Sequence, residues 1–362
     1  MKGSYEYLTG GPGEWRQFQE RNEALDALGA QARARSGRDC RLVDIYSDGT
    51  RMQGTLWLPP GAEQAAPGSL PALLLCHGWG GIRSGLDAGF ARTFARAGMV
   101  VLTFDYRGWG GSDGLIAAFS APGANRRQQE LGRAADRSHG SGATVEGLAG
   151  HIVRQVVDMD WQLTDIEAAL DFLDGEPVVD SSRLALWGVS QGGGHVLSIG
   201  ARHRDRLCAI IAQVPSCGVE GAGDPPGRAQ QAREDAIMRA RGLRPLSVPQ
   251  GVQHGHLPGM DGVPNLRKLC RYRPLETAHL IGCPVLIVDA AEEEVFDRNK
   301  NGRAAFEIVV KRNPASQYHV LPGRHYDAYD GPAGQFKEAT TKSIAFLQEQ
   351  FKRPQQQSQA RL

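Results

Sequence analysis

The chain has 362 residues, 41% of them hydrophobic and 22% charged, with a formal net charge of +1. These values are typical of a globular protein with one large α/β domain or two modest domains, and they give no reason to expect binding to nucleic acid or to an anionic membrane surface. No apolar run approaches the roughly 20 residues that a membrane-spanning helix requires.

The first predicted element is a helix within residues 13–35. Four apolar side chains and one Asn recur at steps of three and four residues, with charges between them: Trp15, Phe18, Asn22, Leu25 and Leu28. A helix with such a stripe must dock on another surface. Residues 1–38 are therefore interpreted as a helical arm that packs on its own domain, forms a homodimer contact or covers the active site.

An α/β pattern begins near residue 40. Residues 41–47 and 51–58 flank the turn residues Asp48-Gly49 and predict an antiparallel hairpin. Unbroken apolar runs then predict strands buried on both faces, at residues 72–76, 99–104, 183–187, 207–213 and 284–288. The clearest helix covers residues 159–173, where the apolar side chains have helical spacing. This alternation predicts an open, mostly parallel central sheet flanked by helices.

Two long stretches interrupt the alternation. Residues 113–150 are rich in Gly, Ala and Arg and show no strand pattern, whereas residues 215–280 hold many Pro, Gly, Arg and His residues and one predicted helix over 228–241. Long insertions in a compact domain are usually functional lids or binding loops. We therefore expect a core of residues 39–214 and 281–350, a cap or lid of residues 215–280, and a flexible tail of residues 351–362.

The strongest chemical signal is Gly188-Val189-Ser190-Gln191-Gly192, which follows a predicted strand and precedes a predicted helix. In a loop this pentapeptide would carry little information. Between a strand and a helix, the glycines allow a tight turn past the serine, whose hydroxyl is then held above the sheet. The helix points its N-terminal amides at the same place. Ser190 is therefore the predicted nucleophile.

A glycine-rich turn, His77-Gly78-Trp79-Gly80-Gly81, follows the apolar run of residues 72–76. Acyl transfer creates an oxyanion that needs two converging hydrogen-bond donors. We expect the backbone amides of Gln191 and Trp79 to supply them. Taken alone, the glycines could equally well end a strand, but the nearby serine turn favours the chemical role.

His325 is the predicted general base because it follows a short predicted strand, residues 317–321, and comes after the candidate acids, in the order typical of serine hydrolases with parallel sheets. The acid should follow the strand of residues 284–288, where the sequence offers Asp289, Glu292, Glu293, Glu294 and Asp297. Glu293 is preferred since it comes early in the loop, and Asp297 is the alternative. Asp297 could instead bind free backbone amides near the start of a helix predicted through residues 304–310.

These features resemble the α/β-hydrolase superfamily, especially the esterase branches near dienelactone hydrolase and the X-Pro dipeptidyl-peptidase/cocaine-esterase group. The similar segments are LLLCHGWGG (73–81), VVLTFDYRGWGGSDG (100–114), LALWGVSQGGG (184–194), PVLIVDAAEEE (284–294) and LPGRHYD (321–327). The resemblance implies an α/β-hydrolase fold from about residue 40 to residue 350, with Ser190 and His325 in a triad. The family usually has Asp where Glu293 aligns, so this chain departs from the pattern at the acid.

The predicted function is hydrolysis of a carboxylic ester, lactones included, through an acyl-enzyme on Ser190. His325 would accept the serine proton, Glu293 would orient the imidazole, and the amides of Trp79 and Gln191 would bind the oxyanion. The same residues would also support amide or peptide cleavage, carbon–carbon bond hydrolysis or acyl transfer to another acceptor. A binding protein on an inactive hydrolase scaffold is the remaining alternative, which the intact set of residues disfavours.

The six cysteines are scattered, without CxxC or Cys/His metal spacing. Buried free thiols, and an N-terminus without an apolar secretory segment, favour the cytoplasm over an oxidising compartment. We expect a small-molecule ester or related acyl substrate, with no cofactor, no metal, no nucleic acid and no membrane partner.

Overall fold

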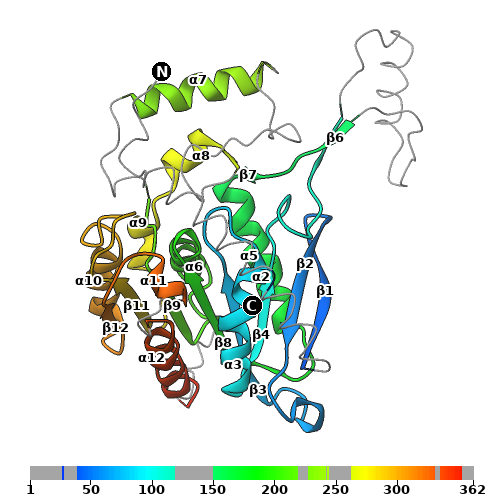
Figure 1. Cartoon of the computed structure of the whole chain (residues 1–362), viewed down its shortest axis with the longest axis vertical. Helices are drawn as coiled ribbons and strands as arrows, with labels where there is room; N and C mark the ends of the chain where they lie inside the picture. Colours follow the sequence, from blue (N-terminus) through cyan, green and yellow to red (C-terminus); the bar gives the residue numbers. More distant parts are fainter. Residues whose placement is uncertain are drawn as a thin grey trace.

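The centre of the molecule is an eight-stranded sheet with the order β1-β2-β4-β3-β8-β9-β11-β12 (Figure 1). The strands are β1 (Cys40–Ser47), β2 (Thr50–Trp57), β3 (Leu70–Cys76), β4 (Val100–Phe104), β8 (Val179–Val189), β9 (Ala209–Gln213), β11 (Val285–Ala290) and β12 (Gln317–Leu321). β2 is antiparallel to β1 and β4, and the neighbours from β4 to β12 are parallel. The computed structural model describes residues 39–118, 150–218, 227–241, 262–330 and 335–352, with the single residues Ala27 and Leu243.

This sheet is the mostly parallel one expected from the sequence. The predicted hairpin is β1–β2, and its turn residues Asp48 and Gly49 have the positive φ values, 47° and 78°, that a tight hairpin requires. Alternate residues of β3 enter opposite layers, since Leu74 packs in one hydrophobic cluster and Leu75 in the other. Burial on both faces explains why the sequence of such strands is apolar throughout rather than alternating.

Helices cover both faces of the sheet (Figure 1). One face carries α5 (Met159–Asp174), α6 (Gln191–Arg202) and α10 (Gly302–Arg312), whose apolar side chains join the cluster that contains Leu74. The other face carries α2 (Arg83–Leu86), the π-helical turn η4 (Asp87–Ala91), α3 (Arg92–Arg96) and α12 (Gln335–Gln350). Phe90, Phe94 and Phe346 pack together with Leu75 there. The sheet is therefore the middle layer of three.

The described ends of the first insertion form a short antiparallel ribbon of β5 (Ile116–Ala118) and β6 (Gly150–Ile152). These strands went unrecognised in the sequence, where residues 113–150 show no strand pattern. Three-residue strands leave too little periodicity to recognise in a sequence. Burial does not mark them either, since Ile116 and Ile152, which are partners across the ribbon, are both exposed.

The second insertion contributes α7 (Arg228–Ala240), β10 (Val263–Pro264), α8 (Leu266–Arg271) and α9 (Pro274–Ala278). α7 packs against α8, and both lie beyond one end of the sheet, at the top of Figure 1. β10 pairs with β7 (Val156–Val157), directly before α5, and α9 packs on α6 and α10. The second insertion therefore rejoins the core at α9, which contacts two core helices. A cap role for residues 215–280 stays a prediction.

The predicted arm of residues 1–38 falls outside the described residues, apart from Ala27, and so does the predicted tail beyond residue 352. The loop before β3 contains a short 3-10 helix, η3 (Ala62–Gln64). Among the helices that the structure describes, none combines the length and the apolar character needed to span a bilayer.

Candidate active site

Ser190 is the single residue between β8 and α6. Its backbone has φ +57° and ψ −121°, a conformation that residues with a side chain rarely adopt. Hydrogen bonds hold it from both sides: its amide donates to the carbonyl of Gln213 at 2.9 Å, and its carbonyl accepts from the amide of Ser216 at 2.9 Å. The sharp turn therefore depends on pairing with the chain that leaves β9.

The glycines beside Ser190 are required by close backbone contacts. A Cβ atom at Gly188 would lie 2.2 Å from the carbonyl oxygen of Gly192, and one at Gly192 would lie 2.3 Å from that of Cys76 at the end of β3. Real Cβ atoms do not approach backbone oxygens so closely. The G-x-S-x-G pattern thus has a steric cause, which is close packing of the turn on itself and on β3.

His325 follows β12, just before the short helix α11 (Asp327–Asp330). Its Nε2 lies 3.2 Å from Ser190 Oγ, and its Nδ1 lies 2.8 and 2.9 Å from the two carboxylate oxygens of Glu293. The side chains of His325 and Glu293 are 1% and 3% exposed, and Ser190 is 6% exposed. A hydroxyl, an imidazole and a carboxylate are thus linked in series, shielded from solvent.

The loop after β11 directs Glu293, and not Asp297, at the imidazole. Glu293 Oε1 also accepts hydrogen bonds from the amides of Val295 and Phe296, at 2.9 and 3.2 Å. Asp297 Oδ1 accepts from the amide of Asn299 at 3.0 Å. Asp297 thus binds a backbone amide, as expected, but in the loop rather than at the helix start, because α10 begins later, at the N-cap Asn301.

The glycine-rich turn after β3 lies directly against Ser190. A Cβ atom at Gly78 would be 3.0 Å from Ser190 Cβ, and Gly80 has φ +66°, which a tight turn here requires. Trp79 is partly buried in this turn, and Gln191 is the first residue of α6. The two residues predicted to bind an oxyanion thus belong to the two segments that meet at Ser190.

A buried polar cluster beneath the turn is absent from the sequence predictions. The side-chain amide of Gln191 donates to Gln162 Oε1 on α5, and its nitrogen lies 3.1 Å from His195 Nε2. Burial lowers the pKa of His195 to about 3, so the ring is neutral. Gln162 and His195 are polar residues on the buried, mostly apolar faces of α5 and α6. That placement is the signal that could have identified them.

Asp289, one of the carboxylates considered for the acid, lies within β11 and is 2% exposed. The hydroxyl of Tyr318 donates to its Oδ2 at 2.8 Å. The pKa of Asp289 is raised to about 7, mainly by burial and to a smaller extent by the negative charge of Glu293. Within the described residues, no group of three or more His, Cys, Asp and Glu side chains is placed to hold a metal ion.

The sequence is similar to a known family model and to known bacterial proteins. Residues 71–242 match a family model described as alpha/beta hydrolase fold. An uncharacterized 31.7 kDa protein of Escherichia coli, from the traX-finO intergenic region, is 29% identical over 284 residues, which are 72% of this chain and 85% of that protein. The quorum-quenching protein AidA of Acinetobacter baumannii is 25% identical over 334 residues, or 84% of this chain and 94% of AidA.

A similar solved structure is that of the alpha/beta hydrolase GrgF from Penicillium. It superimposes with a TM-score of 0.61 at 20% sequence identity and covers 86% of this chain and 99% of its own. At 20% identity, the structural similarity shows a shared fold and no more. The core built around the eight-stranded sheet therefore has the same architecture as GrgF.

Proposed function

Because the chain is a member of the α/β-hydrolase superfamily, we propose that it is a serine hydrolase whose substrate is a carboxylic ester or lactone. The observation that carries the proposal is the series Ser190–His325–Glu293, in which each neighbour lies within 3.2 Å of the next. A nucleophile, a base and a group that orients the base, each within hydrogen-bond reach, are what acyl transfer requires.

In the first step, Ser190 Oγ attacks the carbonyl carbon of the ester while His325 Nε2 accepts the hydroxyl proton. Nδ1–H of His325 donates to Glu293, which fixes the tautomer and stabilises the imidazolium that forms. The amides of Gln191 and Trp79 bind the oxyanion of the tetrahedral intermediate. The partial positive charge at the start of α6 favours the same intermediate. As the intermediate collapses, the imidazolium returns its proton to the departing alkoxide.

In the second step, a water molecule gives a proton to His325 Nε2 and attacks the acyl carbon. Collapse of this second intermediate releases the carboxylic acid and restores the hydroxyl of Ser190. For a lactone, the alcohol formed in the first step stays attached to the acyl group, so one hydroxy acid is the whole product. The His325 ring acts as base and then as acid in each half of the cycle.

The proposal is tested by Ser190→Ala, with Ser182→Ala at an exposed position of β8 as the matched control. Hydrolysis of p-nitrophenyl butyrate is measured together with covalent labelling by a fluorophosphonate probe. Ser190→Ala should lose on the order of 10³-fold or more in kcat/KM and should not label, whereas Ser182→Ala should retain both properties. Near-normal turnover by Ser190→Ala would refute the proposed nucleophile. If the wild-type protein labels but cleaves no p-nitrophenyl ester or lactone, the ester assignment is wrong and a screen of amides follows.

A further inference from the structure

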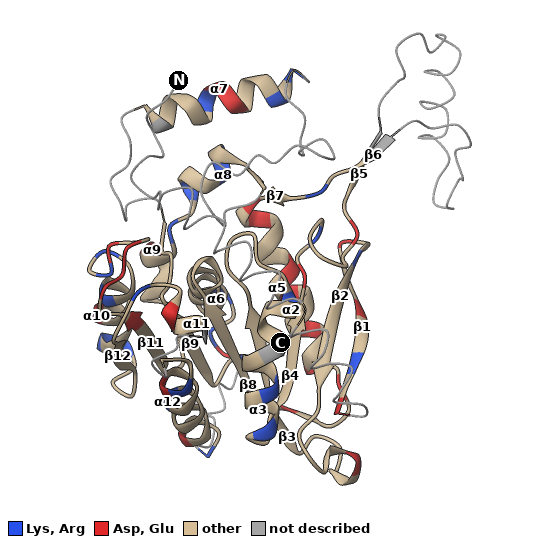
Figure 2. Cartoon of the chain, in the orientation of Figure 1, with Lys and Arg blue, Asp and Glu red and all other residues tan. Residues whose placement is uncertain are grey.

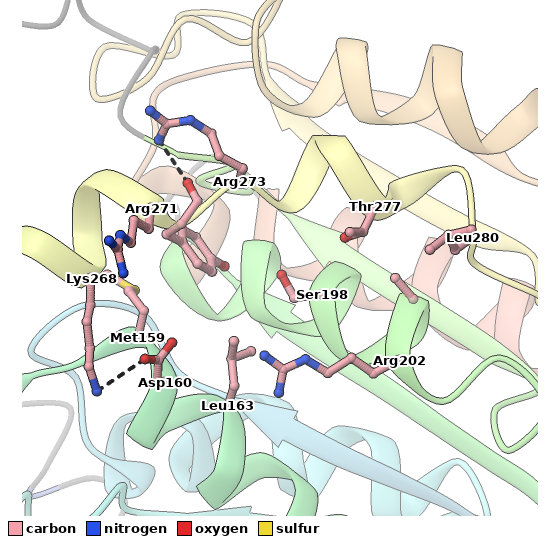
Figure 3. Close-up of a pocket in the computed structure, with 12 residues that line it drawn as sticks. Met159, Asp160, Leu163, Ser198, Arg202, Lys268, Arg271, Arg273, Thr277 and Leu280 are labelled. Carbon is pink, nitrogen blue, oxygen red and sulfur yellow. Dashed lines mark hydrogen bonds and ion pairs between the residues drawn. The ribbon is translucent and has the colours of Figure 1, made fainter.

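A cleft of about 260 Å³ lies between α5, α6, α8 and α9, on the outer side of α6 (Figure 3). Figure 3 shows Lys268 and Arg202 extending into it from opposite walls. Arg271 and Arg273 also line it, from α8 and the link to α9. In Figure 2, α8 and this link carry positive charge, while the start of α5 carries negative charge.

The charges around the cleft do not cancel. Lys268 forms ion pairs with Asp158 and Asp160, at 2.9 and 3.2 Å, and Arg202 forms one with Glu167 at 3.1 Å. Arg271 and Arg273 form no ion pair with any carboxylate in the described part of the chain, and Arg273 donates to the backbone carbonyl of Tyr272. Four cations are therefore matched by three carboxylates, of which Glu167 is shared with His203. Among the described residues, the planar guanidinium groups of Arg271 and Arg273 thus have no carboxylate partner, which suits them to bind an anion.

The floor of the cleft is apolar and tightly packed. Met159, Leu163, Ala201 and Tyr272 line it and are all buried. Met159 Sδ accepts a hydrogen bond from the Gln191 side chain, and the Tyr272 ring packs edge-on against His195 at 5.2 Å between ring centres. The floor of the cleft is therefore held in place by contacts with core side chains.

The cleft is separate from the proposed active site. Its lining residues Ser198 and Arg202 lie 8 and 12 positions after Ser190 on α6. At 1.5 Å per residue, these positions are about 12 and 18 Å along the helix from the nucleophile. None of the predicted triad and oxyanion residues is among the residues that line the cleft, so it is distinct from the space around the Ser190 hydroxyl.

We propose that this cleft is a second binding site, for a small organic monocarboxylate with a short apolar chain. The carboxylate would bind the guanidinium groups of Arg271 and Arg273 at the rim, in the planar geometry that arginine prefers. The apolar chain would lie on Leu163 and Ala201 below. A phosphate ion would match the rim but would gain nothing from the apolar floor. Weak binding of phosphate therefore distinguishes a site for apolar monocarboxylates from a site that accepts any anion.

The test is isothermal titration calorimetry with sodium acetate, butyrate and hexanoate, and with inorganic phosphate at the same ionic strength. The protein is the full chain carrying Ser190→Ala, so that the result does not depend on turnover. We expect saturable binding that tightens with chain length, by up to about fourfold per methylene group. Binding of phosphate as tight as that of hexanoate, or no saturable binding, would overturn the proposal.

The location is tested with the double variant Arg271→Gln/Arg273→Gln in the same background. The matched control is Arg96→Gln/Lys342→Gln, which removes the same charge from exposed positions on α3 and α12. Hexanoate affinity should fall about tenfold or more in the first variant and stay unchanged in the second. Equal losses in both would reveal a net-charge effect, and no loss in either would place binding elsewhere; each outcome contradicts the proposed site.

Discussion

At the scale of single residues, two carboxylates four positions apart have different surroundings. Glu293 faces His325 and accepts hydrogen bonds from the amides of its own turn. Asp289 is buried against Gly302, where an added Cβ would lie 2.3 Å from its oxygens, and it accepts the hydroxyl hydrogen of Tyr318. The first surroundings suit a carboxylate that orients an imidazole. The second favour a carboxyl group that holds its proton near neutral pH.

The choice between Glu293 and Asp297 leads to a prediction for the triad. Glu293→Gln should reduce kcat on an ester by a factor on the order of 10² to 10⁴, because an amide cannot stabilise the imidazolium of His325. Asp297→Asn should stay within about threefold of wild type, since Asp297 Oδ1 bonds the amide of Asn299 and an Asn oxygen can accept the same hydrogen bond. Steady-state kinetics on p-nitrophenyl butyrate measures both. The reverse pattern would identify Asp297 as the acid.

Asp289 leads to a prediction for stability against pH. Its pKa is about 7 in the folded protein and 3.8 ordinarily, so between these values the folded state binds more protons than the unfolded state. The free energy of unfolding should therefore fall as pH rises from about 4 to 7. Asp289→Asn keeps an acceptor for Tyr318 and removes this fall, so the variant should gain on the order of 1–3 kcal/mol over wild type between pH 5 and pH 8.

Urea unfolding of both proteins at pH 5 and pH 8 measures this difference, with Asp297→Asn as the control that removes a carboxylate from the neighbouring loop. An Asp289→Asn variant whose stability runs parallel to wild type at both pH values would show that Asp289 does not titrate in this range.

The sequence identified the serine and the histidine of the candidate site more firmly than the acid. The sequence order predicted Ser190, His325 and Glu293 as a triad, and the structure places them shortly after β8, β12 and β11, within hydrogen-bond distance in series. Their catalytic roles stay predictions. Sequence reasoning preferred Glu293 but kept Asp297 as the alternative, since both follow β11 within a few residues and a loop can fold back in several ways. The deciding feature is the turn in which Glu293 accepts the amides of Val295 and Phe296. That turn has no distinctive sequence pattern.

At the scale of elements, long elements were predicted better than very short ones. The predicted helix of residues 159–173 is α5, which ends one residue later, and the predicted strand of residues 317–321 coincides with β12. α5 buries an apolar face, so its periodicity is strong, whereas in β12 only Leu321 is buried. The pairing of β7 with β10 was not predicted, because two-residue strands are defined by the partner they meet and not by their own sequence. The branch-level resemblance to dienelactone hydrolase likewise stays a prediction.

The β8–Ser190–α6 turn leads to a prediction about an element. In Gly192→Ala, the new Cβ would lie 2.3 Å from the carbonyl oxygen of Cys76 and 2.6 Å from that of His77. The glycine-rich turn must shift away, which should reduce kcat/KM at least about 100-fold and destabilise the fold by about 1–3 kcal/mol. The matched control is Gly85→Ala in α2, where a Cβ meets nothing within 4 Å. Ester kinetics and Tm measure both variants, and an active Gly192→Ala enzyme would contradict the steric explanation.

At the scale of the whole molecule, the sheet topology assembles the site. Ser190 and His325 are 135 residues apart in sequence, yet they follow strands of one parallel run, β8, β9, β11 and β12. Parallel neighbours end at the same edge of a sheet, so the loops after them meet. The same topology leaves the segment between β9 and β11 free to extend beyond the sheet, and α7 and α8 occupy that position (Figure 1).

If residues 215–280 act as a cap, their removal should change substrate preference more than it changes the chemistry. In the test variant, residues 219–261 are replaced by a short Gly/Ser linker between Gly218 and Gly262, which leaves α8, α9 and the core helices in place. Hydrolysis of p-nitrophenyl acetate should stay within about tenfold of wild type, because the triad residues lie in other segments. The ratio of kcat/KM for the octanoate and acetate esters should change by about tenfold or more, because a cap contacts the acyl chain and not the carbonyl.

Near-ultraviolet circular dichroism checks that the shortened chain is folded, and Ser190→Ala in the shortened chain serves as the control for background hydrolysis. An unchanged octanoate-to-acetate ratio in a folded, active variant would show that residues 219–261 do not contact the acyl chain. In that case, chain-length selection must come from the core loops around Trp79 and His325, which the linker leaves intact.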